Sequence, residues 1–214
     1  VYFTGTFDED DVFADYWPTG TFNLVTRQIT NDGFYRIDSE LSDMAVATVF
    51  EDASDYSDMS LQMRALLETG SSPSSGYGLI FRYQDEDNYN VFAVDGLGRF
   101  SIWVRENGLW RELRETQNPW TLNNAVTSIS EMNLLSLELA DDEIRAFVNG
   151  EWVATLTDDT LDAGRIGIYV ASPENGQSSI LVDMFQVSDS PLSLAQSMTG
   201  SLEDDSNITP VPSP

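Results

Sequence analysis

The side chains of this sequence that could do acid–base or metal chemistry are nearly all carboxylates. The 214 residues include 36 Asp and Glu and ten Arg, with no His, no Lys and no Cys. Catalysis by Ser-His-Asp or Cys-His groups is therefore excluded, as are metal sites built from thiolate or imidazole. Two uses remain for the carboxylates. One is a glycosidase pair, whose two carboxyl groups stand about 5 to 10 Å apart; the other is calcium, which takes roughly six to eight oxygen ligands.

The acidic residues gather in short runs between apolar segments. The most acidic runs are Asp8-Glu9-Asp10-Asp11, Asp85-Glu86-Asp87 and Asp158-Asp159. Carboxylates in turns are usually solvated, and they bind a cation only where several of them converge. The runs by themselves favour solubility and divalent-cation binding.

Polar residues at alternate strand positions are candidates for ligand binding. In the segment 60–68, apolar and polar residues alternate, so Arg64 faces outward if Met63 faces the core. The same reasoning turns Arg82 and Asn90 outward, away from their apolar neighbours. We expect these polar side chains to share one exposed sheet.

Two tryptophans, Trp103 and Trp110, are the aromatic candidates. Trp103 shares one face of its strand with Arg99, Ser101 and Arg105. An exposed Trp beside Arg and Asn is a common way to stack a sugar ring and to hydrogen-bond its hydroxyls. The alternative is that both Trp side chains cover the edge of a sheet, while the Arg side chains offset the surrounding acid.

The elements that must position these side chains are short strands. Period-2 patterns and β-branched or aromatic residues predict strands at 33–38, 44–50, 60–68, 77–83, 88–94, 99–105, 109–114, 134–140, 143–148, 152–155, 165–171 and 179–187. Asn149-Gly150 between two of them is the signature of a type I′ hairpin turn. So many strands without intervening helices predict an all-β protein, a sandwich of two packed antiparallel sheets in the manner of a jelly roll.

The chain divides into one domain and a tail. We expect the sandwich at residues 1–188 and an acidic, Ser- and Pro-rich tail at 189–214, with a short helix at 191–198. The tail is either a linker or an assembly element. In the second case the apolar opening, Val1-Tyr2-Phe3, and the segment 192–198 add to a neighbouring copy.

The segment Gly78-Leu79-Ile80-Phe81-Arg82-Tyr83-Gln84-Asp85-Glu86-Asp87-Asn88-Tyr89-Asn90-Val91-Phe92 resembles a signature of bacterial laminin-G-like and keto-disaccharide-hydrolase-like domains. These domains belong to the concanavalin A-like superfold. Other segments agree with them in order, namely Gly33–Ile37, Phe100–Trp103, Gly108–Leu113, Phe147–Gly150, Gly164–Ile168 and Val182–Val187. The resemblance covers roughly residues 5–188 and implies a concanavalin A-like jelly roll. Such domains serve as sensor ectodomains, glycan binders, adhesive modules and, in some cases, hydrolases.

The resemblance also bears on metal and catalysis. The first and last strands of related jelly rolls often carry calcium, which implies structural calcium at Asp8, Asp10, Asp11 and Asp183. The alternative is a solvated loop, with Asp183 as a turn partner. The Glu-x-Asp-x-x-Glu strand pattern of concanavalin A-like glucanases is absent, so we expect that the chain is not an enzyme.

The net charge of −26 bears on the partners. Nucleic acid and anionic membrane surfaces need a basic protein surface, so we expect neither of them as a partner. No apolar run approaches the roughly 20 residues that span a bilayer, so we expect no membrane insertion. The chain begins without Met and without a signal-like segment, and we expect a secreted or cell-surface protein whose signal has been removed.

Three functions follow from these patterns, in order of preference. The first is a non-catalytic extracellular recognition or adhesion module that binds glycan or protein. The second is a self-assembling cell-surface or filament subunit that binds other copies of itself through its termini. The third is a carboxylate glycoside hydrolase.

Overall fold

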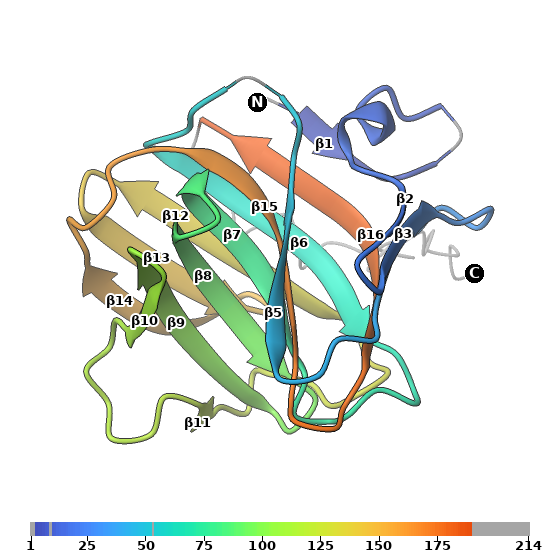
Figure 1. The fold of residues 1–214 in the computed structure, drawn as a ribbon. Helices are drawn as coiled ribbons and strands as arrows, with labels where there is room; N and C mark the ends of the chain where they lie inside the picture. Colours follow the sequence, from blue (N-terminus) through green and yellow to red (C-terminus); the bar gives the residue numbers. More distant parts are fainter. Residues whose placement is uncertain (1–2, 9, 53, 190–214) are drawn as a thin grey trace, which may run out of the picture.

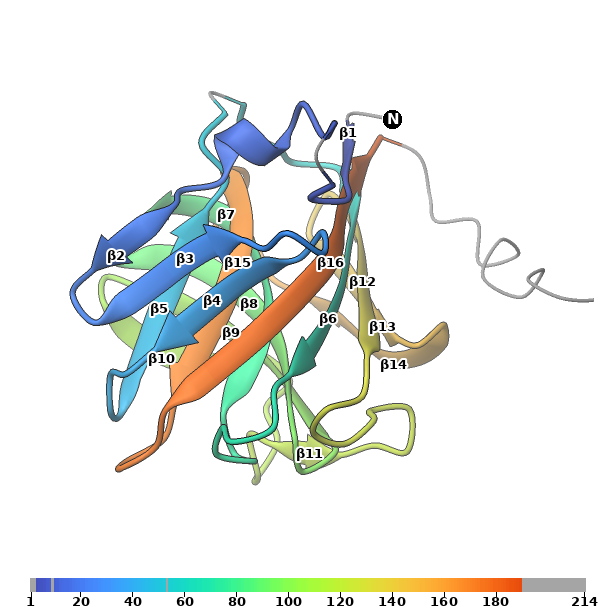
Figure 2. The same cartoon turned by 90° about the vertical axis from the view of Figure 1, so that its right-hand side faces the viewer.

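The structure, a computed structural model, describes residues 3–8, 10–52 and 54–189. Two antiparallel sheets pack face to face (Figure 1, Figure 2). Sheet A consists of β1 (Phe3–Gly5), β2 (Gly20–Phe22), β3 (Val25–Ile29), β4 (Tyr35–Ser39), β6 (Met59–Leu67), β12 (Asn133–Ala140), β13 (Glu143–Val148), β14 (Glu151–Thr157) and β16 (Ser178–Ser188). Sheet B consists of β5 (Met44–Val49), β7 (Gly76–Asp85), β8 (Asn88–Asp95), β9 (Arg99–Glu106), β10 (Leu109–Glu112), β11 (Thr121–Leu122) and β15 (Arg165–Ser172).

In each sheet, some neighbouring strands are consecutive in the sequence and others are far apart in it. Sheet A runs β14-β13-β12-β6-β16-β4-β3-β2, with β1 beside β16. Sheet B runs β10-β9-β8-β7-β15-β5, with β11 beside β9. The all-β, two-sheet jelly roll expected from the sequence is confirmed. The last strand that the structure describes, β16, thus lies in the middle of sheet A, between β6 and β4.

Tight turns join the consecutive strands. Asn149 and Gly150, between β13 and β14, have φ angles of 52° and 81°, and Asn107 and Gly108, between β9 and β10, have 51° and 80°. Positive φ at both central residues defines the type I′ turn, whose twist matches that of the strands it joins. The hairpin predicted at Asn149-Gly150 is confirmed.

The main core lies between the sheets. From β6, the side chains of Leu61, Met63 and Leu67 are fully buried, and Leu79 and Phe81 face them from β7. Each such side chain contributes about 2 kcal/mol by leaving water. The alternation predicted for residues 60–68 therefore identifies the inner face of sheet A.

Sheet B is also buried on its outer face. A second apolar cluster contains Ile80, Tyr83, Tyr89, Val91, Ala93 and Tyr169. Ile80 lies between the core residues Leu79 and Phe81, and successive strand residues point to opposite faces, so this cluster covers the side of sheet B away from sheet A. Apolar side chains on both faces make sheet B the more buried layer.

The first strand packs on the last (Figure 2). Phe3 pairs with Val187 and Gly5 pairs with Phe185. The ring of Phe3 stacks on that of Phe50 at 4.5 Å, and Phe3 is only 5% exposed. The expectation that Phe3 docks on a neighbouring copy is therefore wrong, because its own domain buries it.

The remaining predictions about the termini concern Val1, Tyr2 and the tail with its helix at 191–198. Apart from residue 189, these lie outside the described residues, so assembly through them stays a prediction. Within the described ranges, the one helical element is the 3-10 turn η1 (Ala14–Tyr16). None of the helices found in these ranges is long and apolar enough to cross a membrane.

Candidate functional site

Aromatic side chains gather on the outer face of sheet B. We define this surface, the aromatic face, by six residues: Tyr83 of β7, Tyr89 of β8, Trp103 of β9, Trp110 of β10, Trp120 of the β10–β11 connection and Tyr169 of β15. Strand pairing explains their convergence. Arg105 of β9 lies opposite both Tyr89 and Trp110, so the three form one row across neighbouring strands.

Trp110 is the centre of the aromatic face. Its ring centroid lies 5.4 Å from that of Tyr89, 6.3 Å from that of Trp103 and 6.2 Å from that of Tyr169. All three contacts are edge-to-face, with interplanar angles of 87°, 83° and 74°, a favoured geometry for aromatic pairs. Trp110 remains 37% exposed, whereas Tyr89 and Tyr169 are buried. An indole ring is thus fixed by its neighbours and open to solvent.

Three arginines lie against the rings of this face. The Cζ atom of Arg105 is 5.5 Å from the Trp110 centroid. The Cζ atom of Arg99 is 5.7 Å from the Trp120 centroid, and Arg165 lies in the same way 5.1 Å from Tyr83. Such cation–π contacts contribute about 0.5 to 1 kcal/mol at exposed positions. They place guanidinium groups beside the aromatic surface.

Small residues form the floor on which the rings lie. A Cβ atom at Gly76 would be 3.1 Å from the Trp120 ring and 3.5 Å from that of Tyr169. The absence of a side chain at Gly76 therefore leaves the space that the Trp120 ring occupies. Ala93 and Ala171 are further small residues of the same surface.

The aromatic face also includes polar atoms that are buried. The Oγ of Ser101 and the Nε of Arg105 are buried and have no hydrogen-bond partner among the residues that the structure describes. Both residues lie on the same side of β9 as Trp103, by strand alternation. Buried polar atoms are normally paired, so unpaired ones indicate a missing partner such as water or a ligand.

Burial also affects the tyrosines of the aromatic face. It raises the pKa of Tyr89 above its ordinary value, opposed by the charge of Arg105. Burial raises the pKa of Tyr169 in the same direction. Both hydroxyls are therefore protonated at neutral pH and can donate as well as accept.

Two carboxylates of sheet B, those of Asp95 and Glu112, are already paired. Asp95, which is fully buried, accepts the backbone N–H of Arg99 at 3.0 Å and its Nε at 2.7 Å. Glu112 forms an ion pair with Arg114 and accepts the backbone N–H of that residue at 2.8 Å. These two acids therefore fix local turns and arginines of sheet B.

The structure brings together only two of the five predicted ligand-binding residues. Trp103 and Trp110 meet on the aromatic face. Arg64 lies on sheet A, where its Nε is 2.8 Å from both carboxylate oxygens of Asp183. The pairing of Arg64 with Asp183 also links a predicted binding residue to a predicted metal ligand.

The expected exposure of Arg82 and Asn90 is wrong, since they are 1% and 0% exposed. For Asn90 the reason is that Tyr89 and Val91 point to the aromatic face, so Asn90 points inward. For Arg82 the reason is an irregularity of β7 after Phe81, where the pairing with β8 shifts and Arg82 has a φ of 50°. Such a bulge reorients the side chain.

The four predicted calcium ligands are engaged in different ways. Asp8 and Asp10 are exposed and line, with Asp11, a hollow of about 1110 Å³. The carboxylate of Asp11 accepts the backbone N–H groups of three nearby residues at 2.9 Å each. Asp183 is paired with Arg64. In residues 3–8, 10–52 and 54–189, no group of three or more acids could hold a metal ion. Structural calcium at the four predicted ligands stays a prediction.

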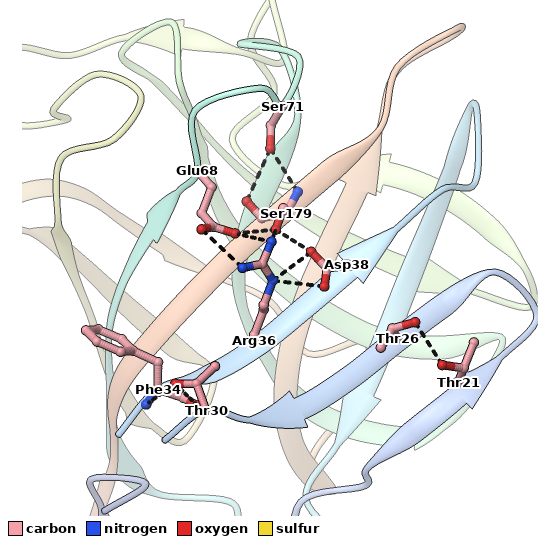
Figure 3. A network of polar contacts seen from close by, with 9 residues as sticks. All are labelled: Thr21, Thr26, Thr30, Phe34, Arg36, Asp38, Glu68, Ser71 and Ser179. Carbon is pink, nitrogen blue, oxygen red and sulfur yellow. Dashed lines mark hydrogen bonds and ion pairs between the residues drawn. The ribbon is translucent and has the colours of Figure 1, made fainter. Parts of the chain in front are cut away.

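A second polar cluster lies on the outer face of sheet A (Figure 3). Arg36 of β4 forms ion pairs with Asp38 and Glu68, both at 2.9 Å. The Oγ of Ser179 on β16 lies 2.5 Å from both carboxylates, and Ser71 bonds the backbone of Ser179. The cluster borders a cavity of about 380 Å³. Because Arg36 bonds both carboxylates and Ser179 bonds them as well, we interpret the cluster as a cross-link between β4, β16 and the end of β6.

The fold is shared with solved structures of low sequence identity. The carbohydrate-binding module CBM66 from Bacillus subtilis superposes with a TM-score of 0.63 at 18% identity, over 81% of this chain and 95% of that one. The β-glucanase from Bacillus licheniformis gives 0.59 at 11% identity, over 87% and 97%. The laminarinase catalytic domain from Thermotoga maritima gives 0.60 at 12% identity, over 90% and 98%. No protein-family model and no curated protein matches the sequence.

These likenesses contradict the expectation that the chain is not an enzyme. The β-glucanase and the laminarinase domain carry the same architecture as this chain. The absence of one strand motif was therefore too narrow a basis for excluding catalysis, and we withdraw that prediction. The architecture itself is a concanavalin A-like jelly roll.

Proposed function

We propose that the aromatic face binds carbohydrate, with Trp110 as the platform on which a sugar ring stacks. The observation that carries the proposal is the Trp110 indole, which is exposed yet held by three neighbouring rings. A ring that is already immobile loses little conformational entropy when a ligand binds. The apolar face of a sugar can therefore pack on it with small ordering cost.

Polar groups beside the platform suit the hydroxyls of a sugar. Arg105 lies over the same ring, and its Nε has no hydrogen-bond partner in the described part of the chain. The hydroxyl of Ser101, two residues before Trp103, also lacks a partner within residues 3–8, 10–52 and 54–189. A binding site of this kind combines an apolar surface with a few placed polar groups, which fix the orientation of the ligand.

Similar structures support the choice of ligand class. One is described as a carbohydrate-binding module, and others as a glucanase and a laminarinase. We propose by the same argument that the chain acts outside the cell, secreted or at the cell surface. The support is that one neighbour is named as a carbohydrate-binding module and two as a β-glucanase and a laminarinase, classes of protein that often act outside the cell.

The test compares two tryptophans. Trp110 and Trp152 are both exposed, but Trp152 lies on β14 at the far edge of sheet A. A glycan array screened with the unaltered protein identifies ligands, and calorimetry then measures their affinity for W110A and W152A. We expect W110A to lose tenfold or more in affinity and W152A to bind as the unaltered protein does. Equal affinity of all three proteins, or an array without signal, would refute the proposal.

The same ligands serve to test for catalysis. Each glycan that binds is incubated with the protein and assayed for new reducing ends. Hydrolysis that is lost in E112Q or D95N, with binding retained, would place a carboxylate reaction on the aromatic face. Binding without hydrolysis would limit the function to recognition.

A further inference from the structure

Most arginines of this acidic chain have a carboxylate partner. Seven of the ten form an ion pair with a described Asp or Glu, namely Arg36, Arg64, Arg99, Arg105, Arg111, Arg114 and Arg145. Because the net charge is −26, acidic side chains that could pair with an arginine are abundant. An arginine that pairs with none of them is therefore unusual in this molecule.

Three arginines lack an ion pair in the part of the chain that the structure describes. Arg27 instead donates from Nε to the hydroxyl of Thr48 at 2.8 Å. Arg82 is buried and donates to two backbone carbonyls. Arg165 is half-buried, and its side chain has neither an ion pair nor a hydrogen bond to any described residue.

Arg165 lies at the end of a continuous row of rings. Its Cζ atom is 5.1 Å from the Tyr83 centroid. Tyr83 lies 5.5 Å from Tyr89, and Tyr89 lies 5.4 Å from Trp110. Contact with a ring positions a guanidinium but does not consume its N–H donors, of which an arginine has five. A short oligosaccharide that stacks on Trp110 and runs along this row reaches free donors at Arg165.

We infer that the aromatic face is built for an acidic glycan, whose carboxylate or sulfate group is bound by Arg165. The inference rests on the proposed carbohydrate binding of that face. The planar guanidinium matches a carboxylate or sulfate with two parallel hydrogen bonds, whereas a neutral hydroxyl uses only one donor. A protein of this charge repels anions at long range, so an acidic ligand needs a dedicated cation at the site.

The experiment uses ligand pairs that differ only in charge. Uronic-acid oligosaccharides are compared with their carboxyl-reduced forms, and sulfated oligosaccharides with their desulfated forms. A chelator is present throughout, so that no divalent cation bridges acids of the protein and of the ligand. The variants are R165Q and R145Q. Arg145 pairs with Glu138 and Glu143 on sheet A, so R145Q removes the same charge from the other sheet.

We expect the acidic member of at least one pair to bind about tenfold more tightly, the size of one charge-assisted contact. R165Q abolishes this preference and leaves the affinity for the neutral member unchanged, while R145Q preserves both. The two kinds of pair decide between carboxylate and sulfate. The difference between the unaltered protein and R165Q also shrinks as salt screens the contact.

Other outcomes separate this inference from the function on which it rests. If neutral glycans bind through Trp110 and the acidic forms bind no better, the preference for acidic ligands is wrong and carbohydrate binding stands. The same holds if R165Q and the unaltered protein bind acidic forms equally. If no glycan of either kind binds, the proposed function itself fails.

Discussion

The guanidinium of Arg82 on β7 donates from Nη1 to the backbone carbonyl of Asp158, 2.9 Å away, and so ties sheet B to the segment that follows β14 of sheet A. Its Nη2 donates to the carbonyl of Asp141 at 2.7 Å. Asn90 adds a bond of 2.9 Å to the carboxylate of Asp158. Burial lowers the pKa of Arg82, opposed first by the charge of Asp158. One buried cation thus joins both layers.

Replacement of Arg82 by Met should destabilise the domain. Two backbone carbonyls would lose their donors, and Asp158 would lose its nearest buried cation, which together cost about 3 kcal/mol. Urea unfolding of R82M measures the loss. R145M is the control, because Arg145 forms only surface ion pairs, and its cost should stay below about 1 kcal/mol. Equal stability of R82M and the unaltered protein contradicts the role of Arg82 in joining the two sheets.

Alkaline pH should unfold the protein through its buried tyrosines. Burial raises the pKa of Tyr77 to about 12, partly offset by its hydrogen bond with Asn133, and burial raises the pKa of Tyr35 and Tyr169 as well. A tyrosine in the unfolded chain ionises near pH 10 while the folded one keeps its proton. The stability is therefore complete below about pH 10 and is lost as the pH rises toward 12, by about 3 kcal/mol for Tyr77 alone.

Urea unfolding at a series of pH values measures this dependence. Without His, Lys or Cys, no side chain has an ordinary pKa between about 5 and 10, so the free energy of unfolding should be flat there. Y77F should show a smaller decline above pH 10, although it is less stable at neutral pH for want of the bond to Asn133. A decline that starts near pH 7 contradicts this account.

Two glycines of β7 should respond differently to Ala. A Cβ at Gly78 would lie 2.0 Å from the backbone oxygen of Phe92, so G78A must push β7 away from β8, at a cost of about 3 kcal/mol or more. A Cβ at Gly76 meets the Trp120 ring instead, which can move. Thermal unfolding and tryptophan fluorescence distinguish them. We expect G76A to stay folded with altered emission and weakened glycan binding; similar melting temperatures for both variants contradict the distinction.

Asp11 should matter for stability, whereas Asp10 should not. The Asp11 carboxylate accepts the backbone N–H groups of Thr6, Phe7 and Phe13. D11A leaves these donors without a partner and should cost about 2 kcal/mol. Asp10 is exposed, so D10A should change the stability by less than about 0.5 kcal/mol. Chemical unfolding of both variants makes the comparison, and equal losses refute it.

The prediction of calcium is tested with the same variants. If the loop binds the ion, the melting temperature of the unaltered protein rises with calcium and falls with chelator, and D10A reduces the rise because a ligand is lost. D183N should leave the rise intact, since Asp183 is already paired with Arg64. A melting temperature that is the same in calcium and in chelator contradicts the prediction of a calcium site.

The sequence predicts the sheets well because alternation is a local property. The strand expected at 60–68 is β6 at Met59–Leu67, and the one expected at 143–148 is β13. The strands β1, β2 and β3 were not predicted, because each is short or lacks a clear apolar alternation. β1 pairs with β16, which is distant in sequence, whereas β2 pairs with β3 and β3 with β4, which are close in sequence.

The site was harder to predict, because alternation does not say which face is covered. Apolar residues at Val91, Phe92, Ala93 and Val94 fill both faces of β8, a pattern of strands buried on both sides. That run could have shown that Asn90 faces inward. Trp120 could not have been found, because it reaches the aromatic face from a connection between strands.

The pairing of β1 with β16 also allows the order of the strands along the chain to be changed. Phe3 and Val187 are direct partners, so the two ends of the sandwich leave it side by side. A short linker could join them and a new start could be cut in an exposed turn, which gives a circular permutant with every strand pair retained. For the same reason, a fluorescent domain placed before residue 3 and another after residue 188 would lie close together, and energy transfer between them would report the separation of β1 from β16.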